Sequence, residues 1–181
     1  RRQRQMCIRD RSKDFKYDEV GKAFGVLRIK GYPIEIALPR TETKSGTGHK
    51  GFDVQIDPDL PFERAVQRRD FTINALGLCP LTGQLLDPCD GYSDINSKIL
   101  RHVGPAFCED PLRVLRGMQF IARFELTPLP ETVEICKSMN MEDLAPERIF
   151  EEWKKLIIKG INLSDGLNFL KNTTCLLYTS P

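Results

Sequence analysis

The chain has 181 residues, 40% of them hydrophobic, which is enough for one domain, or for one domain and part of a second, around a packed core. No apolar run approaches the roughly 18–20 residues that span a bilayer, and no signal-peptide pattern opens the chain. The six cysteines form no CxxC pair, so their spacing favours neither a zinc site nor a disulfide framework and predicts reduced thiols in a cytoplasmic protein.

The two ends share a coding property. Residues 6–10 can be encoded by ATGTGTATAAGAGAC, and residues 175–180 by TGTCTCTTATACACATCT, which contains the reverse complement of the first string. The shared string resembles a transposon-end adapter used for sequencing libraries, so we expect residues 1–12 and 175–181 to be disordered, translated adapter. Without them five arginines and one aspartate are lost, and the net charge changes from +2 to −2. The alternative is a basic N-terminal tail that binds nucleic acid.

Strands are predicted for much of the first half. Residues 26–30 and 34–38 flank a Gly-Tyr-Pro turn and predict a hairpin, with Glu35 on the polar face of its second strand. The polar, glycine-rich residues 41–51 predict a mobile loop. A short helix is expected over 61–69, and a further hairpin over 72–78 and 84–86.

Helices are predicted for the second half. Asp110-Pro111 is a helix-start signal for a helix that ends near Phe124. Further helices are predicted over 131–139, 147–159 and 163–171. Strands followed by helices indicate an α+β fold with a helical second unit.

Arg68, Arg69, Asp70 and Asn74 form the first cluster of polar side chains. Two guanidiniums suit phosphate oxygens, and the carboxylate and amide that follow suit ribose hydroxyls. The alternative is structural: the arginines end a helix, and Asp70 and Asn74 make turns.

The second cluster is Asp110, Arg113 and Arg116 at the start of the predicted helix. Arg113 and Arg116 share a helix face, where like charges repel unless an anion lies nearby. Asp110 and Arg113 together offer an acceptor and donors to the edge of a base. The alternative is a capped amphipathic helix with solvated arginines and with Leu112, Leu115 and Phe120 in the core.

Glu35 is the third candidate. A carboxylate on the polar face of a strand can bind a metal or support a metal ligand, although an exposed strand glutamate is the commoner outcome.

These stretches resemble successive motifs of one family. RRDFTINAL (68–76), LLDPCDGYSDINSKILRHVGPAF (85–107) and EDPLRVLRGMQFIARF (109–124) are similar to motifs of the class II tRNA nucleotidyltransferases, in the same order. Residues 34–52 resemble the strand and flexible loop of bacterial CCA-adding enzymes, and residues 144–157 the start of their helical neck. The resemblance covers nearly all of residues 20–160 and is highly specific because the motifs occur in order.

The resemblance implies an α+β nucleotidyltransferase-type head, a small mixed sheet with helices, followed by a helical neck. It places a partial head at 13–107 and a truncated neck at 108–174. Arg69, beside Arg68, would contact the nucleotide phosphates, and Asp70 and Asn74 the ribose. Asp110 and Arg113 would pair with the base edge of CTP or ATP. Arg116 would add a further nucleotide contact; some bacterial members carry arginine where this chain has Gln119.

The implied reaction adds CCA to the 3′ end of tRNA: the tRNA 3′-hydroxyl attacks the α-phosphate of CTP or ATP and pyrophosphate leaves. Two divalent metals, normally Mg²⁺, assist it. The family's principal metal ligands, an Asp-x-Asp strand after a Gly-Gly turn, are absent from this sequence, so we expect a fragment that is inactive alone, with Glu35 as a possible supporting carboxylate. The sequence indicates no membrane and no particular protein partner.

Three alternatives stay open. A poly(A) polymerase shares the RRDFTINAL-type motif but typically has Arg-Tyr before its Glu-Asp-Pro, where this chain has Phe107-Cys108. An enzyme that adds only CC or only A is the second. The third is a nucleotide- or RNA-binding module without catalysis.

Overall fold

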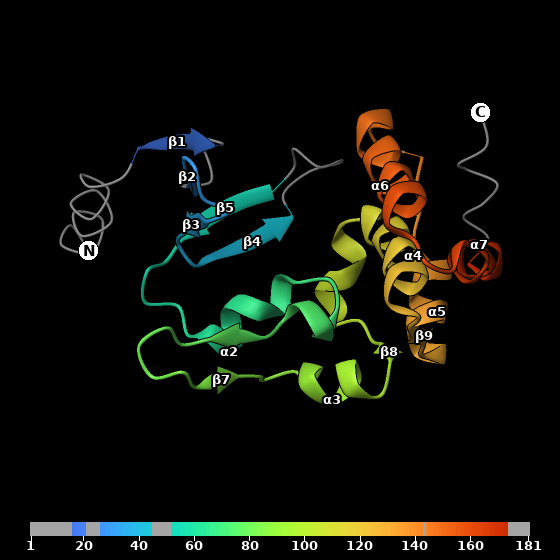
Figure 1. Cartoon of the computed structure of the whole chain (residues 1–181), viewed down its shortest axis with the longest axis horizontal. Helices are drawn as coiled ribbons and strands as arrows, with labels where there is room; N and C mark the ends of the chain where they lie inside the picture. Colours follow the sequence, from blue (N-terminus) through green and yellow to red (C-terminus); the bar gives the residue numbers. More distant parts are fainter. Residues whose placement is uncertain (1–15, 21–25, 45–51, 143, 174–181) are drawn as a thin grey trace. The chain divides into compact units, whose positions relative to one another are not determined.

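The computed structural model describes residues 16–20, 26–44, 52–142 and 144–173 (Figure 1). The residues expected to be translated adapter, 1–12 and 175–181, lie outside these ranges. The described residues fall into two compact units, one up to Ala65 and one from Val66 onward.

The first unit contains a three-stranded antiparallel sheet in the order β1 (Tyr17–Val20), β2 (Val26–Ile29) and β3 (Glu35–Ala37). The predicted hairpin is therefore confirmed, and β1 extends it by one strand. Gly31 in its turn has φ +82°, a left-handed conformation that glycine adopts without steric cost. The register places Arg28 of β2 opposite Glu35 of β3.

A second antiparallel pair joins β4 (Arg40–Lys44) to β5 (Phe52–Ile56). The loop prediction for 41–51 is wrong for residues 41–44, which are strand, and residues 45–51 lie outside the described ranges. Alternating threonines at 41 and 43 suit a strand once a partner is available, and that partner was not recognisable locally. The predicted helix over 61–69 is divided into α2 (Phe62–Ala65) and the 3₁₀ helix η2 (Val66–Arg68).

The second unit begins with a departure from the predicted hairpin. Residues 72–74 form the 3₁₀ helix η3 (Thr72–Asn74), and only β6 (Gly77–Leu78) pairs with β7 (Leu85–Leu86). The strand prediction is wrong for residues 72–76 because this segment bonds elsewhere. Thr72 N–H donates to Arg101 O at 3.0 Å, and Val103 N–H donates to Asp70 O at 3.0 Å.

Short elements connect this segment to the helical half. They are α3 (Gly91–Asn96), β8 (Ile99–Leu100), which pairs in parallel with β9 (Thr127–Pro128), and η4 (Pro105–Glu109). All four predicted helices of the second half are confirmed. They are α4 (Leu112–Phe124), α5 (Pro130–Lys137), α6 (Pro146–Lys159) and α7 (Leu163–Asn172).

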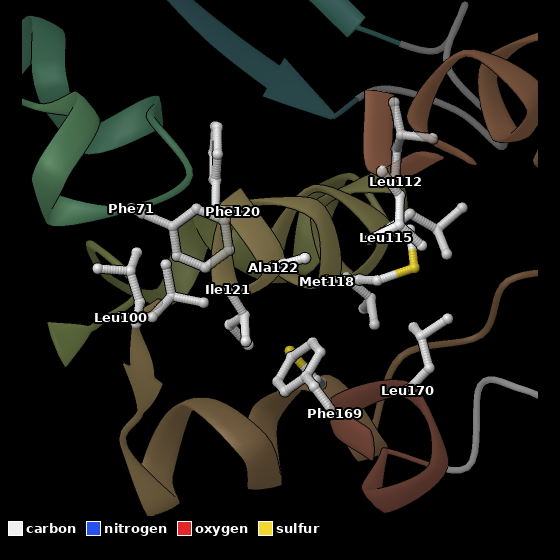
Figure 2. Packing of buried hydrophobic residues seen from close by; sticks show 14 of the residues in the cluster. Phe71, Leu100, Leu112, Leu115, Met118, Phe120, Ile121, Ala122, Phe169 and Leu170 are labelled. Carbon is white, nitrogen blue, oxygen red and sulfur yellow. The ribbon is translucent and has the colours of Figure 1, made fainter. Parts of the chain in front are cut away.

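The core of the second unit lies along α4, which packs against α6 and α7 (Figure 2). Leu112, Leu115 and Phe120 are buried in it, as the amphipathic pattern predicts. Aromatic rings continue the core: Phe71 packs edge-on against Phe107, with ring centroids 5.3 Å apart. The segment that carries Asp70 is thus held to the helices by burial of its neighbour.

The architecture confirms the predicted α+β fold class. Among the described residues, no helix has both the length and the apolar character needed to cross a membrane.

Candidate functional site

Asp70 is the centre of the candidate site. It is only 7% exposed, and its Oδ1 accepts hydrogen bonds from Phe71 N–H at 2.8 Å and from Asn74 Nδ2 at 3.1 Å. The 3₁₀ turn of η3 brings Asn74 back toward Asp70, because Asn74 N–H donates to Phe71 O. The structure therefore places the predicted carboxylate and amide side by side.

Arg116 from α4 completes the surroundings of this carboxylate. Its Nε donates to Asp70 Oδ2 at 2.6 Å, and its guanidinium lies over the ring of Phe120, 5.3 Å from the centroid. The bonds described use three of the roughly four acceptor positions of the carboxylate. By this count, one position on Oδ2 can accept a hydroxyl.

Arg113 ties three segments of the chain together. Its Nη1 donates to Ala106 O and its Nη2 to Arg68 O, both at 2.6 Å, and the guanidinium lies 5.9 Å from the ring centroid of Phe107. Arg113 and Arg116 share a helix face but contact different oxygen atoms, which relieves the repulsion expected from the sequence. Among the described residues, the two bonds of Arg113 leave Nε–H and one hydrogen on each terminal nitrogen for other acceptors.

Asp110 performs the predicted helix-start role and has a second contact. Its Oδ1 accepts from Leu112 N–H at 3.2 Å, and its Oδ2 accepts from Arg148 Nη2 at 2.8 Å. Arg148 belongs to the first turn of α6, and sequence reasoning missed it. The only local signal was a cation three residues into a helix that begins at a proline, which does not reveal a partner so distant in sequence.

The two adjacent arginines differ in exposure. Arg68 ends η2 and is half-buried, and its backbone carbonyl receives Arg113. Arg69 is exposed, which leaves its guanidinium accessible to an anion in solution. The structural interpretation of the first cluster is also correct in part, because Arg68 closes a 3₁₀ helix and Asp70 stabilises a turn.

Glu35 belongs to the other unit. It pairs across the strands with Arg28, whose Nη2 lies 2.7 Å from Glu35 Oε1, and both side chains are more than half exposed. Within the described ranges, no group of three or more His, Cys, Asp or Glu side chains is arranged to hold a metal ion. Glu35 therefore has a cation as its nearest partner in this structure.

A network behind the site was not recognised from the sequence. Buried Asp94 accepts from Thr72 Oγ1 at 2.7 Å and from Arg101 Nε at 2.9 Å. The hydrogen bond to Asp94 raises the pKa of Arg101. Next to this network, burial lowers the pKa of His102, whose Nδ1 lies 3.0 Å from Thr132 Oγ1.

Comparison with known proteins identifies the family of this chain. Residues 3–101, more than half of the chain, match the family described as the poly(A) polymerase head domain. The chain therefore belongs to the poly(A) polymerase head-domain family.

Within that family, the chain is similar to multifunctional CCA proteins. The protein of Stenotrophomonas maltophilia (strain R551-3) is 45% identical over 151 residues, which cover 80% of this chain and 37% of that protein. The protein of Xanthomonas oryzae pv. oryzae (strain MAFF 311018) is 39% identical over 182 residues, covering 91% and 44%. The chain thus spans less than half the length of these relatives.

A solved structure shares the fold. The crystal structure of the Bacillus stearothermophilus CCA-adding enzyme in complex with CTP superposes with a TM-score of 0.72 at 28% identity. The match covers 86% of this chain and 38% of that one, and so includes residues of both units described here.

Proposed function

We propose that this chain is the nucleotide-reading part of an RNA nucleotidyltransferase that adds CCA to the 3′ end of tRNA from CTP and ATP. The observation that carries the proposal is that α4 and the segment just before it, which carry one polar pair, are bonded to the segment that carries the other pair, within one unit. Asp70 and Asn74 form one pair, Asp110 and Arg113 the other. Arg113 bonds to the backbone just before the first pair, and Arg116 bonds to Asp70 itself.

Each pair suits a different part of a nucleotide. Asp70 keeps an acceptor position for a ribose hydroxyl, and Asn74 can bond the same sugar. Arg113 donors and an Asp110 oxygen would read the base edge, as arginine and aspartate do in other nucleic-acid contacts. Arg69, exposed beside them, would bind the triphosphate, and half-buried Arg68 would support it.

In the proposed reaction the tRNA 3′-hydroxyl attacks the α-phosphate of the bound nucleotide and pyrophosphate leaves. The side chains described here bind and orient the nucleotide; holding the α-phosphate in line for attack is a large part of such catalysis. The family's enzymes generally use a divalent metal, and we propose Mg²⁺, with Glu35 as a supporting carboxylate. The described residues do not supply a fitting metal site, so no step here is assigned to it.

The proposal includes the organisation of the chain. A partial head over 13–107 and a helical neck over 108–174 follow the resemblance. The division by packing falls instead between Ala65 and Val66, because residues 66–107 pack with the helices. The protein is proposed to act in the cytoplasm, where cysteine thiols stay reduced.

Equilibrium binding of CTP, ATP, UTP and GTP to the 181-residue chain, followed by NMR titration, tests the function. CTP and ATP are expected to bind about tenfold or more tightly than UTP and GTP, the discrimination typical of one bidentate base contact. Asp110→Asn is expected to remove most of this preference. Asp165→Asn, an exposed change on α7, is the matched control.

The outcomes separate the alternatives. Binding of ATP alone supports a poly(A)-type or A-adding enzyme, and binding of CTP alone a CC-adding one. Equal binding of all four nucleotides supports a non-selective binding module. Absence of binding, or an Asp110→Asn protein with unchanged preference, contradicts the proposal.

A further inference from the structure

Three side chains behind the ribose-facing pair form a cluster, which we name the brace: buried Thr72 and Asp94, and Arg101, whose side chain is 42% exposed. Asp94 is 3% exposed and accepts three hydrogen bonds, from Thr72 Oγ1 at 2.7 Å and from Arg101 Nε and Nη2 at 2.9 and 3.2 Å. A carboxylate this buried is stable only because these charged and polar donors surround it.

The brace holds Thr72 through its backbone as well as its side chain. Thr72 N–H donates to Arg101 O at 3.0 Å, and the guanidinium of the same Arg101 donates hydrogen bonds to Asp94. A second backbone bond joins the same two segments: Val103, two residues after Arg101, donates its N–H to the carbonyl of Asp70, two residues before Thr72, at 3.0 Å. Asp94 and Arg101 therefore fix the turn that carries Asp70 and Asn74, although neither contacts those two side chains in the interactions described.

The position of α3 shows that the brace is built closely against this turn. A Cβ on Gly91 would lie 2.2 Å from Thr72 O, so only glycine permits the approach. Asp87 secures the start of α3 by accepting hydrogen bonds from Gly91 N–H at 2.7 Å and from Tyr92 N–H at 2.9 Å. Because the start of α3 is held in place, the position of Asp94 relative to Thr72 is fixed.

We propose that Asp94 is a positioning residue for sugar recognition: acting through Thr72, it sets the Asp70–Asn74 turn so that the site distinguishes ribose from deoxyribose. The inference rests on the proposed function, since it assumes that Asp70 and Asn74 face the sugar. A purely structural Asp94 would affect stability and the affinity for every nucleotide alike. An Asp94 that positions the turn affects the difference in affinity between nucleotides with and without the ribose 2′-hydroxyl.

The test measures the ratio of dissociation constants for 2′-deoxyCTP and CTP on the 181-residue chain, with its thermal unfolding midpoint. The wild-type protein is expected to prefer CTP about tenfold, because a site built to bond a hydroxyl penalises its loss. Asp94→Asn, which replaces an acceptor oxygen by an NH₂ group facing donors, is expected to bring this ratio close to one. The preference for CTP over UTP should persist, because Asp110 and Arg113 lie outside the brace.

Two further variants separate positioning from stability. Thr72→Val removes the hydroxyl while keeping the shape and should lower the ratio, whereas Thr72→Ser keeps the hydroxyl and should restore it. Leu170→Ala, in α7 and distant from the brace in sequence, should lower the unfolding midpoint while leaving the ratio unchanged.

Folded Asp94→Asn and Thr72→Val proteins with the wild-type ratio overturn the inference and leave the proposed function intact. If Asp94→Asn does not fold, Thr72→Val alone decides. A wild-type chain that binds CTP but does not distinguish it from 2′-deoxyCTP also overturns the inference. A wild-type chain that binds no nucleotide overturns the proposed function and the inference together.

Discussion

Replacement of Arg113 by alanine tests its structural role. The change removes two hydrogen bonds of 2.6 Å to the carbonyls of Ala106 and Arg68, and the contact with the Phe107 ring. A hydrogen bond to a charged group contributes about 1.5–3 kcal/mol, and we take the lower part of this range because Arg113 is half-buried. The expected loss of unfolding free energy for the two bonds is therefore about 3–4 kcal/mol.

Urea unfolding of the 181-residue chain, followed by the fluorescence of Trp153, measures this loss, because the chain has one tryptophan and it packs against the core of the second unit. Arg113→Lys should be intermediate, since a single ammonium does not span two carbonyls as a guanidinium fork does. Lys137→Ala, which breaks an exposed pair with Glu134, should change the stability by less than about 1 kcal/mol. An Arg113→Ala protein within about 0.5 kcal/mol of the wild type refutes the assignment of these two bonds as structural.

Two further predictions concern buried polar groups. Burial lowers the pKa of His102 below its ordinary 6.5, so the folded state favours the neutral ring. The neutral ring therefore makes its full contribution to the free energy of unfolding above pH 6.5, and this contribution declines as the pH falls toward the lowered pKa of the folded state. Unfolding free energies measured from about pH 7.5 to 5.5 should therefore fall more steeply for the wild type than for His102→Gln; parallel curves would contradict this. Glu152 is 2% exposed, its Oε1 lies 2.7 Å from Lys155 Nζ, and its Oε2 is buried without a hydrogen-bond partner among the residues that the structure describes. Glu152→Met should stabilise the protein by about 1 kcal/mol or more in urea unfolding, whereas Lys155→Met, which leaves the carboxylate buried alone, should destabilise it; the opposite signs would show that Glu152 has a compensating partner.

The helices of the second half were predictable because their signals are local. Pro130 and Pro146 each occupy a first helical position, and the apolar spacing along residues 112–124 matches the face that α4 buries. The β2–β3 hairpin was predictable for the same reason, since its turn sequence lies between two alternating runs.

The errors occur where partners are distant in sequence. Residues 72–76 look like the start of a strand because Thr72 and Ile73 favour strands, yet Thr72 bonds to the backbone of Arg101 and to the carboxylate of Asp94. Tertiary contacts of this kind override local propensity. The β4 strand escaped recognition similarly, because its pairing with β5 depends on a chain reversal that the polar residues between them do not specify.

In the candidate site, too, the residue types were predictable from local sequence, whereas the contacts between distant residues were not. The residue types of Asp70, Asn74, Asp110, Arg113 and Arg116 pointed to a nucleotide, and the structure brings them into one unit. The pairing of Asp110 with Arg148 was not visible, because an arginine at the start of a helix has many equivalent roles. Whether these side chains bind a nucleotide stays a prediction for the binding experiments above.

The proposed base reading by Arg113, combined with its two bonds to backbone carbonyls, affects how this site can change during evolution or engineering. A substitution that alters which base is accepted also removes support from two backbone carbonyls, so new specificity begins with a less stable protein. Lineages or libraries that first accumulate stabilising changes elsewhere in the unit, such as at Glu152, should therefore tolerate more replacements at position 113. On the proposed function, base selection at this site is then limited by folding as well as by chemistry.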